Sequence, residues 1–151
     1  SYPSVLATLS GHPVVNGGVS GELSQAGRAR LPGLLARHRP ALVILLEGGN
    51  DILRGSGEAA LKANLAAMIE AVQGSGAQIL LVGVPRKSLF ADGAPLYGEL
   101  AEQYGLVLDN DSIGELLRDP ALKSDAVHFN AEGYRTLAQR LHRLLQERGA
   151  L

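Results

Sequence analysis

Short apolar runs alternate with longer amphipathic stretches along most of this chain. Continuous apolar runs predict strands at 42–47 and 79–84, because a strand buried on both faces of a parallel sheet is apolar throughout. Shorter runs predict strands at 13–16 and 106–108. Between them, 58–73 predicts an amphipathic helix, since its apolar residues recur at helical spacing. Those residues are Leu61, Leu65, Met68, Ile69 and Val72.

Further helices are predicted at 24–38, 96–104, one turn at 113–117, and after Asn130. The last helix carries an apolar stripe of Tyr134, Leu137, Leu141, Leu144 and Leu145. Segments 85–95 and 119–129 are expected to be irregular. Regular alternation of strands and helices is typical of a parallel sheet with helices on both faces. The sequence therefore predicts an α/β fold.

Residues typical of helix starts, kinks and ends add detail to this prediction. Ser24 is a plausible N-cap for the helix at 24–38, where Pro32 should produce a kink or a new first turn. Gly105 is expected to end the helix at 96–104.

Composition narrows the function classes. A length of 151 residues predicts one domain, and a net charge of -1 gives no case for a nucleic-acid partner. The arginines between Arg28 and Arg39 are better explained as a solvated helix face than as a binding patch. The lack of cysteine excludes disulfides, thiolate metal sites and cysteine nucleophiles. No apolar stretch approaches the ~18 residues of a membrane span, so stable membrane insertion is not expected.

Three glycine-rich or polar loops follow predicted strands. They are Gly17-Gly18-Val19-Ser20-Gly21, Gly48-Gly49-Asn50-Asp51 and Ser124-Asp125-Ala126-Val127-His128-Phe129-Asn130. Loops at the carboxyl ends of parallel strands converge on one edge of the sheet, which is where such folds bind ligands. We therefore expect the chemistry of the protein at this edge.

These loops hold residue types that acyl transfer requires. Asp125 and His128 are three residues apart, which allows the carboxylate to orient the imidazole as in a Ser-His-Asp triad. The Asn50 side chain and the Gly21 backbone N–H can stabilise a developing oxyanion. Taken singly, each pattern also fits a plain turn or a loop glycine with positive φ. Their occurrence together, in this order, favours a catalytic site.

The same residues resemble the GDSL or SGNH hydrolase family, specifically its bacterial thioesterase I / lysophospholipase L1 / arylesterase branch. Residues 14–24 resemble the glycine block of that family, Gly48 to Gly55 its Asn block, and Asp125 to Asn130 its terminal Asp-x-x-His block. The resemblance implies a three-layer α/β/α fold with a mostly parallel, flavodoxin-like sheet. It also implies triad roles for Asp125 and His128, oxyanion-hole roles for Gly21 and Asn50, and catalysis without a metal or organic cofactor.

One block of the family pattern has no match. The Gly-Asp-Ser that ends the family's first strand, and that carries its nucleophile, is not found among the 151 residues. We therefore expect residues 1–151 to form a single SGNH-hydrolase-like domain that is incomplete at its N-terminus, with the catalytic serine upstream. Ser20 is more plausibly a loop residue, because Gly18-Val19-Ser20-Gly21-Glu22 lacks the final glycine of Gly-x-Ser-x-Gly.

Two functional hypotheses follow. The first is a serine hydrolase that cleaves small-molecule carboxylic esters or thioesters. The second is a non-catalytic relative that has lost its nucleophile and binds an acyl or glycan ligand. Glu47 is interpreted as a buried, paired acid, while Tyr97 is one of several residues that can line an acyl pocket. Cytoplasmic and periplasmic locations both fit, the periplasm being favoured slightly by the resemblance, and the sequence leaves substrate chain length and oligomeric state open.

Overall fold

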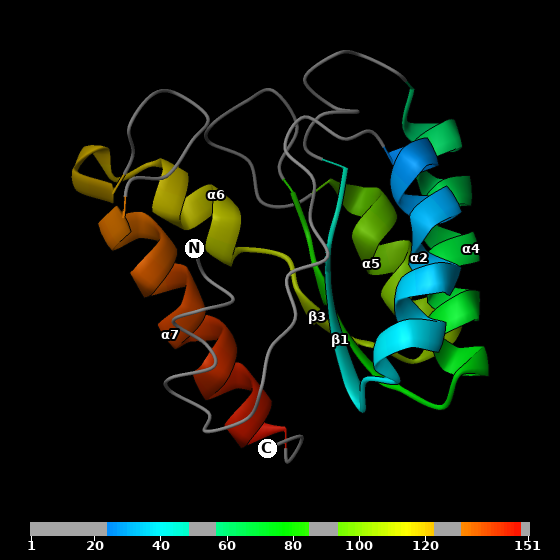
Figure 1. Ribbon diagram of the computed structural model, residues 1–151. Helices are drawn as coiled ribbons and strands as arrows, with labels where there is room; N and C mark the ends of the chain where they lie inside the picture. The colour runs from blue at the N-terminus through cyan, green and yellow to red at the C-terminus, as the bar shows by residue number, and fades with distance from the viewer. Residues whose placement is uncertain (1–23, 49–56, 85–93, 123–130, 149–151) are drawn as a thin grey trace.

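The computed structural model describes residues 24–48, 57–84, 94–122 and 131–148 (Figure 1). Helices and parallel strands alternate through these ranges, as the sequence predicts. In chain order the elements are α2 (Ser24–His38), β1 (Leu42–Leu46), α4 (Glu58–Gly74), β2 (Gln78–Val82), α5 (Pro95–Tyr104), β3 (Val107–Asp109), α6 (Ser112–Leu117), η1 (Pro120–Leu122) and α7 (Ala131–Glu147).

The three strands form a parallel sheet in the order β1-β2-β3. Leu46 of β1 is level with Val82 of β2, which in turn is level with Asp109 of β3, so the strands finish side by side. Helices α2, α4 and α7 begin at the end of the molecule where the strands finish (Figure 1). This edge is therefore the one on which ligands are expected.

The predicted burial of the first of these strands is only partly confirmed. Among the described residues β1 pairs with β2 alone, and only Leu45 of its five residues is fully buried. The central strand of the described sheet is β2, in which Ile79 to Val82 are all buried. Within the described part of the chain β1 has a neighbouring strand on one side and β2 on both, which accounts for the difference in burial between them.

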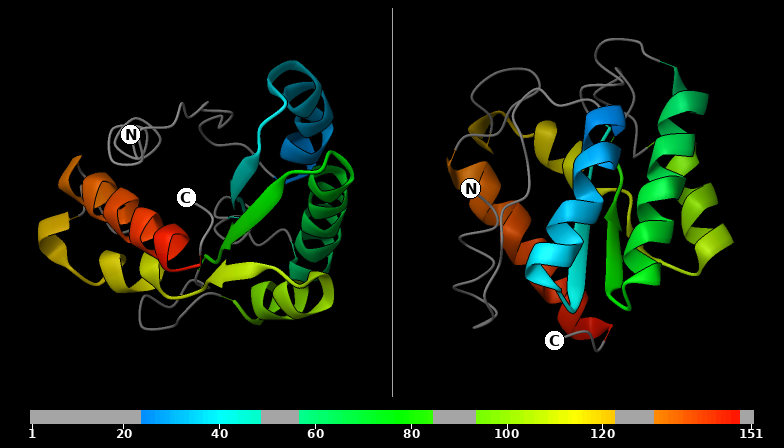
Figure 2. Two further views of the ribbon diagram at one scale, coloured as in Figure 1. Left: turned by 90° about the horizontal axis from the view of Figure 1, so that it is seen from below. Right: turned by 45° about the vertical axis from the view of Figure 1, so that its right-hand side comes forward.

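Helices cover both faces of the sheet, so the fold is a three-layer α/β/α sandwich. Helices α2, α4 and α5 lie on one face, and α6 and α7 lie on the other (Figure 2). Because successive strand side chains point to opposite faces, β2 contributes Ile79 and Leu81 to the first layer and Leu80 and Val82 to the second.

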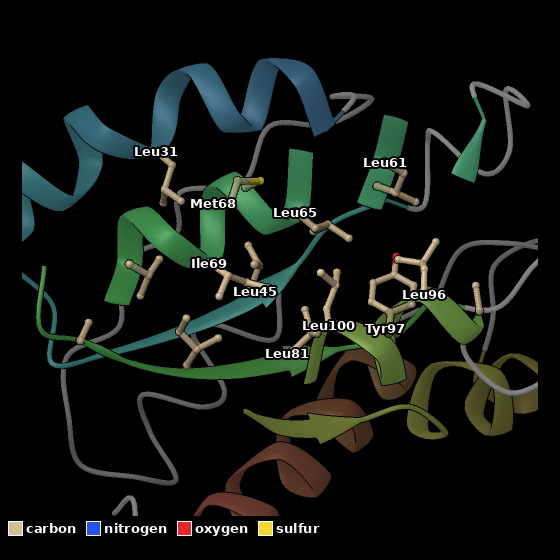
Figure 3. Close-up of a cluster of buried hydrophobic side chains, with 14 of the residues drawn as sticks. Leu31, Leu45, Leu61, Leu65, Met68, Ile69, Leu81, Leu96, Tyr97 and Leu100 are labelled. Atoms are coloured by element: carbon tan, nitrogen blue, oxygen red, sulfur yellow. The ribbon is translucent and has the colours of Figure 1, made fainter. Parts of the chain in front are cut away.

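The larger core lies between the sheet and α2, α4 and α5 (Figure 3). The predicted apolar face of α4 supplies much of it, and all five of its residues are buried. Burial of one such side chain stabilises the fold by roughly 1.5–3 kcal/mol. On the opposite face, Leu137, Leu141 and Leu145 of α7 pack with α6 against the sheet. Leu144 is half-buried, and the side chain of Tyr134 lies outside the described residues.

Of the predicted helix-end signals, the one at Gly105 is confirmed, and those at Pro32 and Ser24 differ from the structure. Gly105 ends α5 in the left-handed conformation, with φ of 67°. Pro32 lies within α2, which is one uninterrupted helix, and Ser24 is the first residue of that helix rather than the residue before it. The predicted loop at 119–129 contains the 3-10 turn η1. None of the helices seen in the described ranges has the length and apolarity that crossing a membrane would require.

Candidate active site

The four predicted site residues, Gly21, Asn50, Asp125 and His128, lie outside the described residues. Their mutual geometry therefore stays a prediction. The structure does describe the ends of the strands and helices that flank their loops. Gly48 is two residues before Asn50, and α7 begins three residues after His128.

The backbone just past β1 is held by a side chain that is distant in the sequence. The hydroxyl of Tyr97, on α5, donates a hydrogen bond of 2.7 Å to the main-chain carbonyl of Glu47. Tyr97 has no exposed surface. Its predicted alternative role as a pocket-lining residue does not fit this burial, because the ring lies within the core and its hydroxyl is engaged by the chain. Glu47 is half-buried rather than buried.

Two features of the backbone just past β1 require a glycine at position 48. Its φ of 111° is a conformation that residues with a side chain rarely adopt. A Cβ atom at this position would also overlap the Tyr97 hydroxyl oxygen and lie 3.0 Å from Cδ1 of Leu61. The chain therefore passes directly over α4 and α5 as it leaves the strand, with no space for a side chain.

A second close approach joins the ends of β2 and β3. The backbone N–H of Gly83 donates a 2.7 Å hydrogen bond to the carbonyl of Asp109. A Cβ on Gly83 would overlap Oδ1 of Asn110, so the Asn110 side chain occupies the space that glycine leaves open. These contacts keep the two strand ends together beyond the regular ladder.

Asp109, the last residue of β3, organises the turn into α6. Its carboxylate is buried, with 6% of the residue exposed. Oδ1 accepts hydrogen bonds from the backbone N–H groups of Ser112 (3.0 Å) and Asp111 (3.3 Å), and Oδ2 accepts one of 2.6 Å from the Ser112 hydroxyl. A carboxylate that accepts N–H groups in the first turn satisfies donors that a helix leaves open.

The surface beside this turn is acidic. The pKa of Asp111 is raised above its ordinary value, chiefly by its hydrogen bond with the Asp109 carboxyl, then by desolvation and by the negative charges of Asp109 and Glu115. Glu115 in turn accepts a 2.5 Å hydrogen bond from Arg140 of α7. This ion pair joins α6 to the helix that follows the predicted Asp125–His128 loop.

Two cavities are lined by described residues. One of about 670 Å³ opens between α2 and α4, where Asn64 donates to the Ser24 hydroxyl and accepts from Arg28. Another, of about 260 Å³, lies at the starts of the three strands, next to Leu42, Gln78 and Val107. In the described part of the chain, no three His, Asp or Glu side chains gather as they would around a metal ion.

Two contributors to this edge were not found from the sequence. The Asp109-x-x-Ser112 spacing is a local signal for a carboxylate that bonds to the first turn of a helix, and it could have been recognised. The contact between Tyr97 and Glu47 joins residues 50 positions apart, and no local pattern reveals it. The sequence suggested Tyr97 only as a candidate pocket residue, and nothing in it predicts the contact with Glu47.

Comparison with known proteins identifies the family to which this chain is similar. The model of the GDSL-like Lipase/Acylhydrolase family matches residues 1–136. The arylesterase of Vibrio mimicus is 31% identical over 92% of this chain and 75% of its own length. Thioesterase 1/protease 1/lysophospholipase L1 of Escherichia coli K12 is 30% identical over 88% of the chain and 67% of its own length. Esterase TesA of Pseudomonas aeruginosa is 51% identical over 47% of the chain, a match that spans only 35% of TesA.

The fold agrees with this relationship. A solved structure described as a crystal structure of TesA superimposes on the chain with a TM-score of 0.83 and 29% identity, and the match covers 97% of this chain and 88% of the chain in that structure. Both the predicted family and the predicted α/β/α fold are thereby confirmed. With a family match over residues 1–136 and this shared architecture, the chain belongs to the GDSL-like lipase/acylhydrolase family of hydrolytic enzymes.

Proposed function

We propose that the protein hydrolyses carboxylic esters or thioesters by acyl transfer at the carboxyl edge of its sheet. The observation that carries this proposal is the family match over residues 1–136, which includes Gly21, Asn50, Asp125 and His128 in family order. The described strand ends support it, because their loops leave one edge of one parallel sheet.

Each residue has a distinct role in the proposed reaction. His128 removes the proton from a serine hydroxyl as that oxygen attacks the carbonyl carbon, and then returns the proton to the leaving group. Asp125 holds the His128 imidazole in the required tautomer and stabilises its charged form. The Gly21 N–H and the Asn50 side-chain amide donate hydrogen bonds to the oxyanion of the tetrahedral intermediate. Water then hydrolyses the acyl-enzyme by the same proton transfers in reverse.

The attacking serine, in this proposal, is supplied by residues that precede Ser1 in the parent protein. The support is the lack of any Gly-Asp-Ser in the 151 residues, although the other blocks of the family pattern are present. Within the described residues β1 has β2 as its only neighbour, which leaves an edge where a further strand can pair. Together these segments would form one SGNH-hydrolase-like domain.

The substrate class follows from the chemistry of the proposed site. Hydrogen-bond donors aimed at an oxyanion stabilise the intermediates of ester and thioester cleavage alike. The names of the relatives, arylesterase and thioesterase 1/protease 1/lysophospholipase L1, cover the same group of acyl compounds. We therefore propose a small-molecule ester or thioester as the substrate.

Steady-state hydrolysis of a p-nitrophenyl ester by the full-length protein tests the proposal. Asn50→Ala is expected to lower kcat by roughly 10²–10³, the usual cost of losing one oxyanion donor. Asn64→Ala is the matched control, since Asn64 lies on α4 and contacts Ser24 and Arg28 instead. Full activity in Asn50→Ala contradicts the proposed oxyanion role, and a wild-type protein that binds acyl compounds without cleaving them supports the binding-protein alternative.

A further inference from the structure

We propose that Tyr97 is a positioning residue for Asn50. Its hydroxyl fixes the turn through which β1 leads into the loop that carries the oxyanion donor. This inference rests on the proposed function, because it assigns a catalytic consequence to a contact below the site. The contact itself belongs to residues that the structure describes in full.

The hydrogen bond is placed where the regular sheet no longer holds the chain. Strand β1 ends at Leu46, so the carbonyl of Glu47 lies beyond the ladder that joins β1 to β2. The Tyr97 hydroxyl donates to that carbonyl at 2.7 Å. At the first residue past β1, a side chain from α5 thus supplies a hydrogen bond to the chain.

The donor is itself held rigidly. Tyr97 is fully buried, and it extends from α5 into the same cluster as Leu61, Leu96 and Leu100 (Figure 3). A close-packed core leaves such a ring little freedom to shift. The position of the hydroxyl is therefore set by the core and not by the loop above it.

Gly48 transmits this position to the loop. It has no space for a Cβ against the Tyr97 hydroxyl and Leu61, so the backbone lies directly on these two side chains. Asn50 follows Gly48 by two residues in the sequence, so the position of Gly48 limits where Asn50 can lie. The Glu47–Gly48 peptide that Tyr97 holds is thus only two residues from Asn50 along the chain.

Oxyanion stabilisation is sensitive to such movement. A donor must lie within hydrogen-bond distance of the oxyanion, not of the ground-state carbonyl. Loss of the Tyr97 hydroxyl should therefore lower kcat while leaving KM nearly unchanged. The expected decrease in kcat is roughly 3- to 10-fold, which corresponds to the contribution of one neutral hydrogen bond.

A double-mutant cycle in the full-length protein tests this inference. Tyr97→Phe keeps the ring and removes only the hydroxyl. It is measured alone and in the Asn50→Ala background, with p-nitrophenyl ester as substrate. If Tyr97 acts through Asn50, Tyr97→Phe lowers kcat in the wild type but changes it less than about twofold once Asn50 is alanine. Residues that act independently would give the same factor in both backgrounds.

Tyr104→Phe is the matched control for the loss of a hydroxyl. Tyr104 lies on the same helix, and its hydroxyl donates a 2.6 Å hydrogen bond to Glu70, away from the strand ends. Its kcat should equal that of the wild type. Thermal unfolding of every variant ensures that each kcat is measured on folded protein.

The outcomes separate the two proposals. An unchanged kcat in Tyr97→Phe, or an equal decrease in both backgrounds, overturns the positioning role and leaves the oxyanion role of Asn50 intact. An unchanged kcat in Asn50→Ala overturns the proposed function itself. A decrease confined to the background that retains Asn50 supports both.

Discussion

The ends of β1 and β3 lie at the same edge of the sheet but are fixed in different ways. At β3, Asp109 accepts hydrogen bonds from Asp111 and Ser112, two and three residues later. At β1, the Glu47 carbonyl is held by the hydroxyl of Tyr97, a buried residue of α5 that is 50 positions away in the sequence. One strand end is a local turn, whereas the other depends on the assembled core.

This difference has a physical consequence. A side chain that bonds to its own neighbours can form its turn wherever the local chain is ordered. The β1 turn exists only when α5 has packed against the sheet, since the donor belongs to that helix. The backbone at Glu47 and Gly48 is thus coupled to core packing, while the entry into α6 is coupled mainly to its own sequence. Substitutions at the two strand ends should therefore differ in the size and the kind of their effects on stability.

Gly48→Ala should give the largest loss of stability. It combines the strain of a positive φ, about 1–2 kcal/mol, with overpacking against Tyr97 and Leu61, about 1–3 kcal/mol. Gly105→Ala is the matched variant, because Gly105 also has a positive φ, of 67°, but nothing within 4 Å of its Cβ position. Urea unfolding should show about 2–5 kcal/mol lost for Gly48→Ala and only about 1–2 kcal/mol for Gly105→Ala. Equal losses would contradict the close packing at the β1 end.

Asp109→Ala should have a smaller effect, because the turn it holds is local. Loss of a carboxylate that bonds to first-turn N–H groups costs about 0.5–2 kcal/mol in the free energy of unfolding. Asp109→Asn keeps an oxygen that can accept the Ser112 N–H, and it should recover part of that loss. Chemical denaturation of both variants measures the difference. If Asn is no better than Ala, the hydrogen bond to Ser112 is not what stabilises the turn.

Asp111→Asn should have the smallest effect, and one that depends on pH. Because Asp109 and Glu115 raise the pKa of Asp111, the folded state binds this proton more tightly than the unfolded state does. The favourable contribution is fully present below the ordinary value of 3.8 and is lost as the pH rises through the raised pKa. Asp111→Asn should therefore be slightly more stable than the wild type at pH 7 and equal to it below pH 3.8, with a difference that shrinks in high salt.

Urea midpoints at both pH values, with and without salt, check this prediction. A variant that is less stable than the wild type at pH 7 would contradict the like-charge interpretation.

Much of the fold could be predicted from local patterns. The face of α4 was identified from five apolar residues at helical spacing, and the end of α5 from one glycine. The half-buried state of β1 could not be predicted, because its apolar run would suit a central strand equally well. Neighbours in a sheet are set by topology, which a five-residue run does not encode.

The candidate site was likewise only partly predictable from the sequence. Residue type and order sufficed to identify Gly21, Asn50, Asp125 and His128 as candidates, because the family pattern lies in short blocks. The support beneath one of those blocks was not recognised, since Tyr97 meets Glu47 only after the chain has folded. Long-range contacts of this kind determine how accurately a donor is placed, and they leave no periodic trace in the sequence.

Labelling with a serine-directed fluorophosphonate tests the central claim most directly. The full-length wild type and His128→Ala are labelled, and the modified peptide is identified by mass spectrometry. Acyl transfer through His128 predicts one modified serine, located upstream of residues 1–151, and labelling that is roughly 10²–10⁴ slower without the base. Modification of a serine within 1–151, such as Ser20, or equal labelling rates in the two proteins, would contradict the account.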